Sequence, residues 1–302
     1  MNTRSIINTL LAITLTGLFV SCSPSKQNES YQMTANSNQA SILNGVNSTT
    51  EYQKNHGIVG IYLLVKGPKG QDGGAICTGT LIRPNVVLTA AHCIASSPEM
   101  RLVGGMVFFT NDMETAIKEM DSGKMDNLRT FAKFKIHERY DNAQTDDQSN
   151  HDVGLIRLSS DAPADFKVAT ILPANLKAKL VPDALLMLSG YGVNTYTKKP
   201  GTEDEFDGAG DGILRQVSGI KLTDISSNGE ELALDQTKGG ACHGDSGGPA
   251  FLTVPATATE TEKTFLVGVT SRGEEPCNKV SIYSSTLGYT DWINTTLVAL
   301  LK

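Results

Sequence analysis

The chain has 302 residues, of which 39% are apolar, enough for a sizeable core. Charged residues make up only 19%, beside 29 glycines and 11 prolines, a balance that favours strands and turns over a helical protein. The net charge is −6 and no basic tract is present, which argues against a nucleic-acid partner.

Residues 1–21 have the pattern of a signal peptide. Arg4 gives a positive start, and the apolar run Leu10–Val20 is too short to span a bilayer. The following Leu-Phe-Val-Ser-Cys resembles the lipobox of bacterial lipoproteins, although that family usually has leucine in place of Phe19. The resemblance implies lipidation of Cys22. An ordinary secretory cleavage that leaves Cys22 free is the alternative, and either one predicts export, to the cell envelope or the exterior.

Residues 22–41 are polar and almost free of aliphatic side chains, so they predict a disordered tether or propeptide. Apolar runs bounded by glycine or proline then predict strands at Ile58–Lys66 and Ala75–Ile82. Similar runs predict strands at residues 85–88, 102–103, 106–110, 130–136, 184–188, 213–222, 249–253, 265–271 and 280–284. Residues 114–120 predict a helical turn or a loop. Residues 196–211 and 253–263 predict loop insertions over the active-site face, and Thr290–Leu301 has the apolar period of a helix.

Three short motifs carry candidate chemistry. His92 lies in Thr-Ala-Ala-His-Cys, and Asp152 begins an apolar run in Asn-His-Asp-Val-Gly-Leu-Ile. Ser246 lies in Gly-Asp-Ser-Gly-Gly-Pro, whose glycines leave the hydroxyl accessible and let N–H groups turn toward an oxyanion. A serine alcohol is a poor nucleophile until a base takes its proton, so Ser246 needs a histidine from elsewhere. We interpret the other histidines as ordinary loop residues: His56, His137, His151 and His243.

In this chain order the three motifs resemble those of the trypsin/chymotrypsin-like serine peptidases. The resemblance covers residues 42–302. It implies an all-β fold of two six-stranded antiparallel β-barrels, with the active site between them and a C-terminal helix. We expect barrel one over about residues 42–170, barrel two over about 171–289 and the helix over about 290–301.

The same resemblance implies the roles of the site residues. Ser246 would attack the peptide carbonyl, His92 would take and return the proton, and Asp152 would orient His92, which makes the chain a serine endopeptidase acting through an acyl-enzyme. The N–H groups of Gly244 and Ser246 would form the oxyanion hole. Ile42, freed by a cut after Ser41, would pair its amine with Asp245, so the uncut chain is expected to be a weakly active zymogen. A start of an ordinary strand at Ile42 is the alternative.

Cysteine pairing is also implied by the resemblance. The expected disulfides are Cys77–Cys93 and Cys242–Cys277, which leave Cys22 as the odd cysteine of five. A cut before Ile42 would then leave nothing covalent between the tether and the catalytic domain, so activation is expected to free the domain from the membrane.

The specificity pocket is expected to be uncharged. Its implied residues are Gly240 at the base, Ala241 beside it, and Ser271, Gly273 and Ser281 on the walls. The pocket therefore predicts cleavage after medium or large uncharged residues. Arg272, where the family usually has an aromatic residue, would weaken apolar packing, and Glu274 and Glu275 at the rim leave a basic preference open.

No metal or cofactor is predicted. Residues 137–141 begin like a zincin motif, but Asp141 stands where the second histidine ligand belongs. The acidic stretches 141–152 and 203–208 suggest calcium, yet Leu214 occupies the twelfth position of the second, where an EF-hand has glutamate. Solvated loops are the preferred interpretation, and calcium binding stays open.

We expect protein or peptide substrates, an activating protease and a monomer. The alternative function is an inactive or weak family member that acts as a surface binding protein, with residues 196–211 as its contact loop. All three triad residues are present, so the sequence favours the enzyme.

Overall fold

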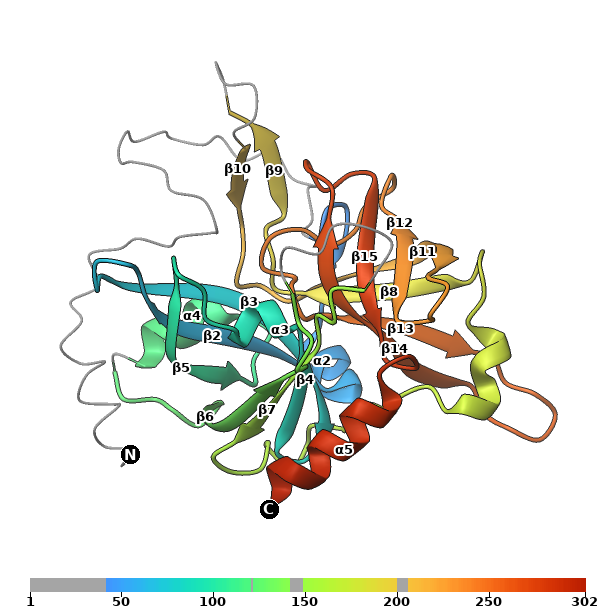
Figure 1. Ribbon diagram of the computed structural model, residues 1–302, viewed down its shortest axis with the longest axis horizontal. Helices are drawn as coiled ribbons and strands as arrows, with labels where there is room; N and C mark the ends of the chain where they lie inside the picture. The colour runs from blue at the N-terminus through green and yellow to red at the C-terminus, as the bar shows by residue number, and fades with distance from the viewer. Residues whose placement is uncertain (1–41, 121, 142–148, 200–205) are drawn as a thin grey trace.

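The apolar runs form strands that close into two β-barrels (Figure 1). This computed structural model describes residues 42–120, 122–141, 149–199 and 206–302. The signal peptide, the tether with Cys22, the cut after Ser41, residues 142–148 of the first acidic stretch and residues 203–205 of the second therefore lie outside the described residues. Within the described part of the chain, no helix has the length and apolarity needed to cross a bilayer.

Barrel one consists of six antiparallel strands in the closed order β2-β3-β4-β7-β6-β5. Their bounds are β2 Ile58–Lys66, β3 Asp72–Arg83, β4 Val86–Thr89, β5 Arg101–Phe108, β6 Leu128–Ile136 and β7 Gly154–Leu158. The β2–β3 pair runs without a register break from Ile58 opposite Thr80 to Lys66 opposite Asp72. Aliphatic side chains such as Ile61 fill the interior, and closure leaves the barrel without a free strand edge.

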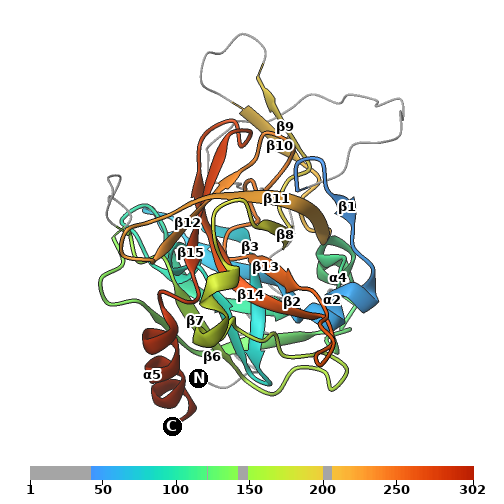
Figure 2. The ribbon, with the colours of Figure 1, turned by 90° about the vertical axis from the view of Figure 1, so that its right-hand side faces the viewer.

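Barrel two is built in the same way. Its bounds are β8 Leu185–Gly190, β11 Arg215–Ile225, β12 Glu231–Asp235, β13 Pro249–Val254, β14 Lys263–Gly273 and β15 Val280–Ser285. The order is β11-β12-β15-β14-β13-β8, and pairing of β8 with β11 closes the ring. The two-residue strand β1, Val46–Asn47, adds to β11 from outside (Figure 2). The two six-stranded barrels and the C-terminal helix confirm the predicted fold class.

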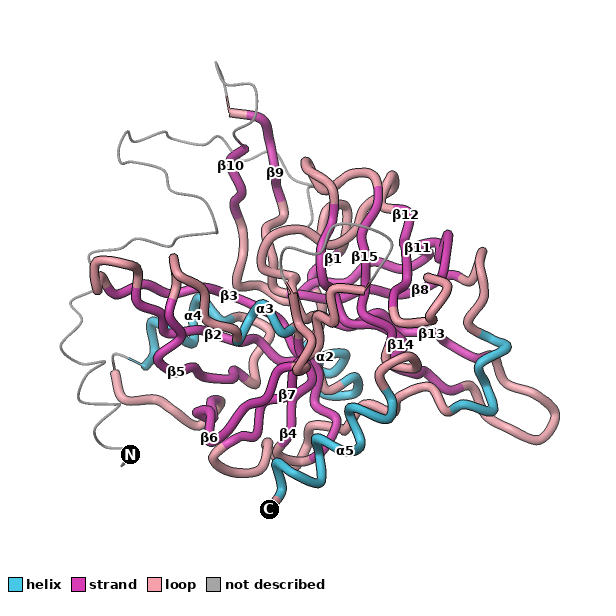
Figure 3. Tube along the Cα trace, in the orientation of Figure 1, coloured by secondary structure: helices cyan, strands magenta, loops and turns pink. Residues whose placement is uncertain are grey.

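Short elements surround the barrels (Figure 3). They are α2 Thr50–His56, α3 Ala91–Ile94, α4 Met113–Met120, η1 Ala174–Lys179 and α5 Thr290–Leu301, together with the hairpin strands β9 Thr195–Lys198 and β10 Phe206–Ala209. The C-terminal helix α5 buries Ile293, Leu297 and Leu300, which pack against the core of barrel one.

The structure corrects the sequence reading in several places. The two short strands expected at 102–103 and 106–110 are one strand, β5. Residues 196–211, expected as a loop, contain the β9–β10 hairpin that projects from the barrels in Figure 1. Neither α2 nor β12 was predicted, because α2 is short and mostly polar and β12 is only five residues long with an acidic residue at each end.

Candidate active site

His92 and Asp152 are brought together by the pairing of β4 with β7. Thr89 lies opposite Gly154 in this antiparallel pair, so the residues that follow β4 and those that precede β7 lie at the same barrel end. His92 Nδ1 lies 2.7 Å from Asp152 Oδ2, and the His92 backbone N–H donates to Oδ1 at 2.8 Å. Two bonds to one carboxylate fix the orientation of the imidazole.

Asp152 is 1% exposed, and hydrogen bonds from neighbouring groups reach both its carboxylate and its backbone carbonyl. The Ser271 hydroxyl donates to its Oδ2 at 2.7 Å, and the Ser284 hydroxyl donates to its backbone carbonyl at 2.7 Å. Burial acts to raise the pKa of Asp152, but attraction to His92 and the hydrogen bonds from His92 and Ser271 hold it below its ordinary value. Burial alone would lower the pKa of His92. The charge of Asp152 and its hydrogen bond outweigh burial, so the pKa of His92 lies above its ordinary value. An ionised Asp152 favours the tautomer with the proton on Nδ1, which leaves Nε2 free to accept one.

Ser246 sits in a turn that joins the two barrels. The Ser246 carbonyl accepts a hydrogen bond from the Thr78 N–H of barrel one at 2.8 Å. The N–H of the following residue, Gly247, donates to the Thr270 carbonyl of barrel two at 2.8 Å. Gly244 has φ 92°, and a Cβ there would lie 2.8 Å from the Cα of Gly192, so only glycine fits. The N–H groups of Gly244 and Ser246 have no acceptor within the described part of the chain, as an oxyanion hole requires.

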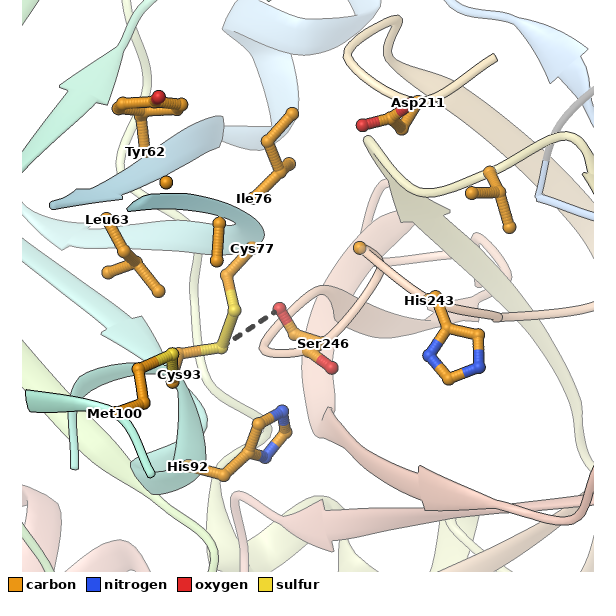
Figure 4. A pocket seen from close by; sticks show the side chains of 14 residues that line it. Tyr62, Leu63, Ile76, Cys77, His92, Cys93, Met100, Asp211, His243 and Ser246 are labelled. Atoms are coloured by element: carbon orange, nitrogen blue, oxygen red, sulfur yellow. Dashed lines mark hydrogen bonds between the residues drawn. A yellow bond between two sulfur atoms is a disulfide. The ribbon is translucent and has the colours of Figure 1, made fainter. Parts of the chain in front are cut away.

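One cavity has His92 on its barrel-one side and Ser246 on its barrel-two side (Figure 4). Gly244 and the Cys77–Cys93 disulfide also line it. Among the described contacts, no hydrogen bond joins Ser246 Oγ to His92. Such bonds are often long without a substrate and tighten when one binds.

Both disulfides that the resemblance implied are present. Cys77–Cys93 links β3 to α3 beside His92, and Cys242–Cys277 links the nucleophile turn to the segment after β14. His92 and His243 each lie within 4.8 Å of one of these sulfur pairs. Disulfide sulfurs are not thiolates, so neither cluster has the donors of a zinc site.

The proposed activation residues lie close to Gly240, the expected pocket base. Ile42 is fully buried in the core of barrel two, and Leu43 exchanges two backbone hydrogen bonds with Gly240, each 3.0 Å. The Asp245 carboxylate is 1% exposed and accepts the N–H groups of Cys242 at 2.9 Å and Gly192 at 2.8 Å. No ion pair to Ile42 is present among the described residues of this uncut chain.

The expected pocket residues differ in exposure. Gly240, Ala241, Ser271 and Ser281 are buried, whereas Gly273 is exposed. The Arg272 guanidinium makes two 2.8 Å bonds to the carboxylate of Glu231, so its charge is already paired.

Two residues near the site were missed by sequence reasoning. His243, taken as an ordinary loop residue, lines the same cavity as Ser246, and its Nε2 lies 2.9 Å from Glu275 and 3.0 Å from the Tyr196 hydroxyl. Its position next to Gly244 was the available signal. Gln236 lies behind Gly240. It belongs to no recognisable motif, so the sequence offered no signal for it.

Comparisons with known proteins agree with this geometry. The Trypsin family model matches residues 36–293. Kallikrein-8 of Mus musculus is 29% identical over 234 residues, covering 74% of this chain and 77% of the relative. Kallikrein 1-related peptidase b11 of Mus musculus is 27% identical over 264 residues, covering 86% and 90%. Hypodermin-A of Hypoderma lineatum is 28% identical over 209 residues, covering 67% and 70%.

A solved structure titled "HL collagenase structure at 1.7A resolution" superposes with a TM-score of 0.60 at 18% identity, covering 84% of this chain and 98% of that one. At 18% identity this structural similarity supports a shared fold and nothing more specific. Because the family model spans most of the chain and the two barrels agree with it, the chain belongs to the trypsin family and is a serine endopeptidase.

Proposed function

We propose that the endopeptidase acts through Ser246, His92 and Asp152. The observation that carries the proposal is the cavity lined by both Ser246 and the Asp152-bound imidazole. Ser246 Oγ attacks the carbonyl carbon of the scissile bond while His92 Nε2 takes its proton. His92 then returns the proton to the leaving amine, and water repeats the sequence in reverse to release the acyl group. Asp152 stays ionised and stabilises the imidazolium.

The oxyanion that forms in each step needs donors. The free N–H groups of Gly244 and Ser246 supply them, and one such donor contributes about 3 kcal/mol to transition-state stabilisation in comparable sites. Gly244 keeps its N–H available through a backbone conformation that a Cβ would obstruct. Nothing in this chemistry requires a cofactor.

The uncut chain is a zymogen in this proposal. A cut between residues 41 and 42 by a separate protease frees the Ile42 amine, which pairs with Asp245 and sets the turn that carries Gly244. Asp245 supports this, because it is buried and its carboxylate accepts hydrogen bonds only from backbone N–H groups among the described residues. Leu43 supports it as well, because it is hydrogen-bonded to the proposed pocket base at Gly240.

The same cut separates the enzyme from its export segment. The two disulfides use four of the five cysteines, so no bridge is left to hold Cys22 to the catalytic domain. We propose a monomeric enzyme that is exported as a lipoprotein and released by processing to act on protein or peptide substrates.

The pocket is proposed to accept uncharged side chains, because glycine at position 240 supplies no carboxylate to bind lysine or arginine. Its proposed residues are Gly240, Ala241, Ser271, Gly273 and Ser281.

Hydrolysis of a denatured protein before and after processing tests the proposal. The processed chain, with Ile42 identified as its first residue by N-terminal sequencing, should cleave at least about 100-fold faster than the uncut chain. Processed Ser246→Ala should be inactive, and processed Asp245→Asn should hydrolyse the protein at a rate close to that of the uncut chain. A folded, processed chain that cleaves nothing would favour the binding protein instead.

A further inference from the structure

Three buried polar atoms near the proposed pocket form no hydrogen bond of good geometry among the described residues, although the Tyr283 hydroxyl lies close to those of Ser281 and Thr270. They are Gln236 Oε1, Ser281 Oγ and the Tyr283 hydroxyl, in side chains that are 1%, 2% and 0% exposed. Buried polar groups in folded proteins nearly always have a partner. Three such groups in one region therefore point to a polar group of a ligand that would complete their hydrogen bonding.

The three groups lie on one face of barrel two. In the β12–β15 pair, Leu234 lies opposite Ser281 and Leu232 lies opposite Tyr283. Residues that are directly opposite share a face of the sheet. Gln236 lies two positions beyond Leu234, and its backbone N–H donates to the Lys279 carbonyl at 2.8 Å, which continues the same row toward the pocket.

Gln236 occupies the space behind Gly240. Its Nε2 donates to the Ala241 carbonyl at 3.1 Å and to the Cys277 carbonyl at 3.4 Å. These two acceptors fix the carboxamide with its oxygen toward Gly240, where a Cβ would lie only 2.2 Å from Oε1. The Gln236 carbonyl therefore stands where a side chain at position 240 would otherwise extend.

We propose that Gln236 and Ser281 form a neutral, hydrogen-bonding pocket base that selects a carboxamide side chain, glutamine or asparagine, on the acyl side of the scissile bond. This inference rests on the proposed function. It narrows the substrate side chains that the pocket accepts from uncharged ones in general to polar uncharged ones. The substrate NH₂ donates to Gln236 Oε1, and the substrate carbonyl accepts from the Ser281 and Tyr283 hydroxyls. Burial raises the pKa of Tyr283, so its hydroxyl stays a donor.

Other side chains fit this base less well. A substrate ammonium or guanidinium would meet no carboxylate at position 240, and a substrate carboxylate would meet the Gln236 carbonyl oxygen, which cannot donate a hydrogen bond to it. An apolar side chain would leave Gln236 Oε1 unpaired, and a site built to hydrogen-bond rejects a ligand that cannot do so.

Peptides that differ only in the residue before the scissile bond test this inference on the processed full chain. We expect kcat/KM for glutamine or asparagine to exceed that for methionine, leucine, glutamate and lysine by at least about 10-fold. Gln236→Leu should bring the ratio of glutamine to methionine close to one. Ser281→Ala, a smaller change, should lower the same ratio, and Gln236→Glu should raise relative activity on lysine.

Gln53→Leu is the matched control, because Gln53 is also buried, its Oε1 has no hydrogen-bond partner in the described part of the chain, and it lies on α2 instead of in barrel two. It should leave the ratio unchanged. Equal or faster cleavage after methionine, leucine or lysine by the wild-type chain would overturn the inference and leave the hydrolase proposal intact. If no peptide is cleaved and Ser246 resists acylation, the proposed function itself fails.

Discussion

Burial of the Asp245 carboxyl makes the stability of the uncut chain depend on pH. Removal from water raises its pKa from 3.8 to about 7, although the N–H groups of Cys242 and Gly192 and the charge of Arg215 oppose the change. Between these two values the folded chain keeps a proton that the unfolded chain releases. The free energy of unfolding therefore falls as the pH rises through this window, by ~4 kcal/mol in all at 1.36 kcal/mol per pH unit.

The measurement uses full-length Ser246→Ala, which cannot cut itself, and the same chain carrying Asp245→Asn. Urea unfolding at pH 5 and pH 8 gives the free-energy difference between the two proteins, in which the contributions of other titrating groups cancel. The stability of Ser246→Ala relative to the double variant should fall by about 3 kcal/mol between these pH values. A difference that does not change with pH would refute the reasoning.

Processing should remove this pH dependence. An Ile42 amine beside Asp245 stabilises the ionised carboxylate, so the pKa of Asp245 should drop below its ordinary value. Stability from such a depressed pKa is present above pH 4 and is lost only as the pH falls further. If processed Ser246→Ala keeps the decline between pH 5 and pH 8, the Ile42–Asp245 pair does not form.

Three further predictions concern the processed enzyme. Ser271→Ala removes one donor from the buried Asp152 carboxylate and should lower kcat/KM about 10-fold, measured with a single peptide substrate; an unchanged value would mean that the bond is dispensable. Gly244→Ala places a Cβ 2.8 Å from Gly192 and should lower kcat about 100-fold while the fold, followed by circular dichroism, is retained. Because His92 must be neutral to act as the base and its pKa is raised, kcat/KM should rise with pH through a midpoint above 6.5, and a midpoint below that value would contradict the His92–Asp152 pair.

Most strands and the last helix were predictable because the apolar side chains that they bury follow one another in short runs or at helical spacing in the sequence. β2 and α5 have the predicted bounds, Ile58–Lys66 and Thr290–Leu301. The short helix α2 is capped at both ends, where the Thr49 hydroxyl accepts the Tyr52 N–H and Gly57 takes the left-handed conformation. Both signals stand in the sequence, but seven mostly polar residues lack the apolar period that marks a longer helix.

Other features depend on contacts between distant residues. β12 begins with Glu231, whose charge is compensated by Arg272 on another strand, so its sequence alone does not identify a buried strand. In the site, the three triad candidates belong to recognisable motifs. Gln236 and His243 do not, because their roles come from groups that only the folded barrel places beside them.

The most direct test of the account is labelling of the processed chain with a serine-directed fluorophosphonate, followed by mapping of the modified residue. We expect one label per chain on Ser246, none in Ser246→Ala, and at least about 100-fold slower labelling in His92→Ala. A label on another residue, or equal rates with and without His92, would contradict it.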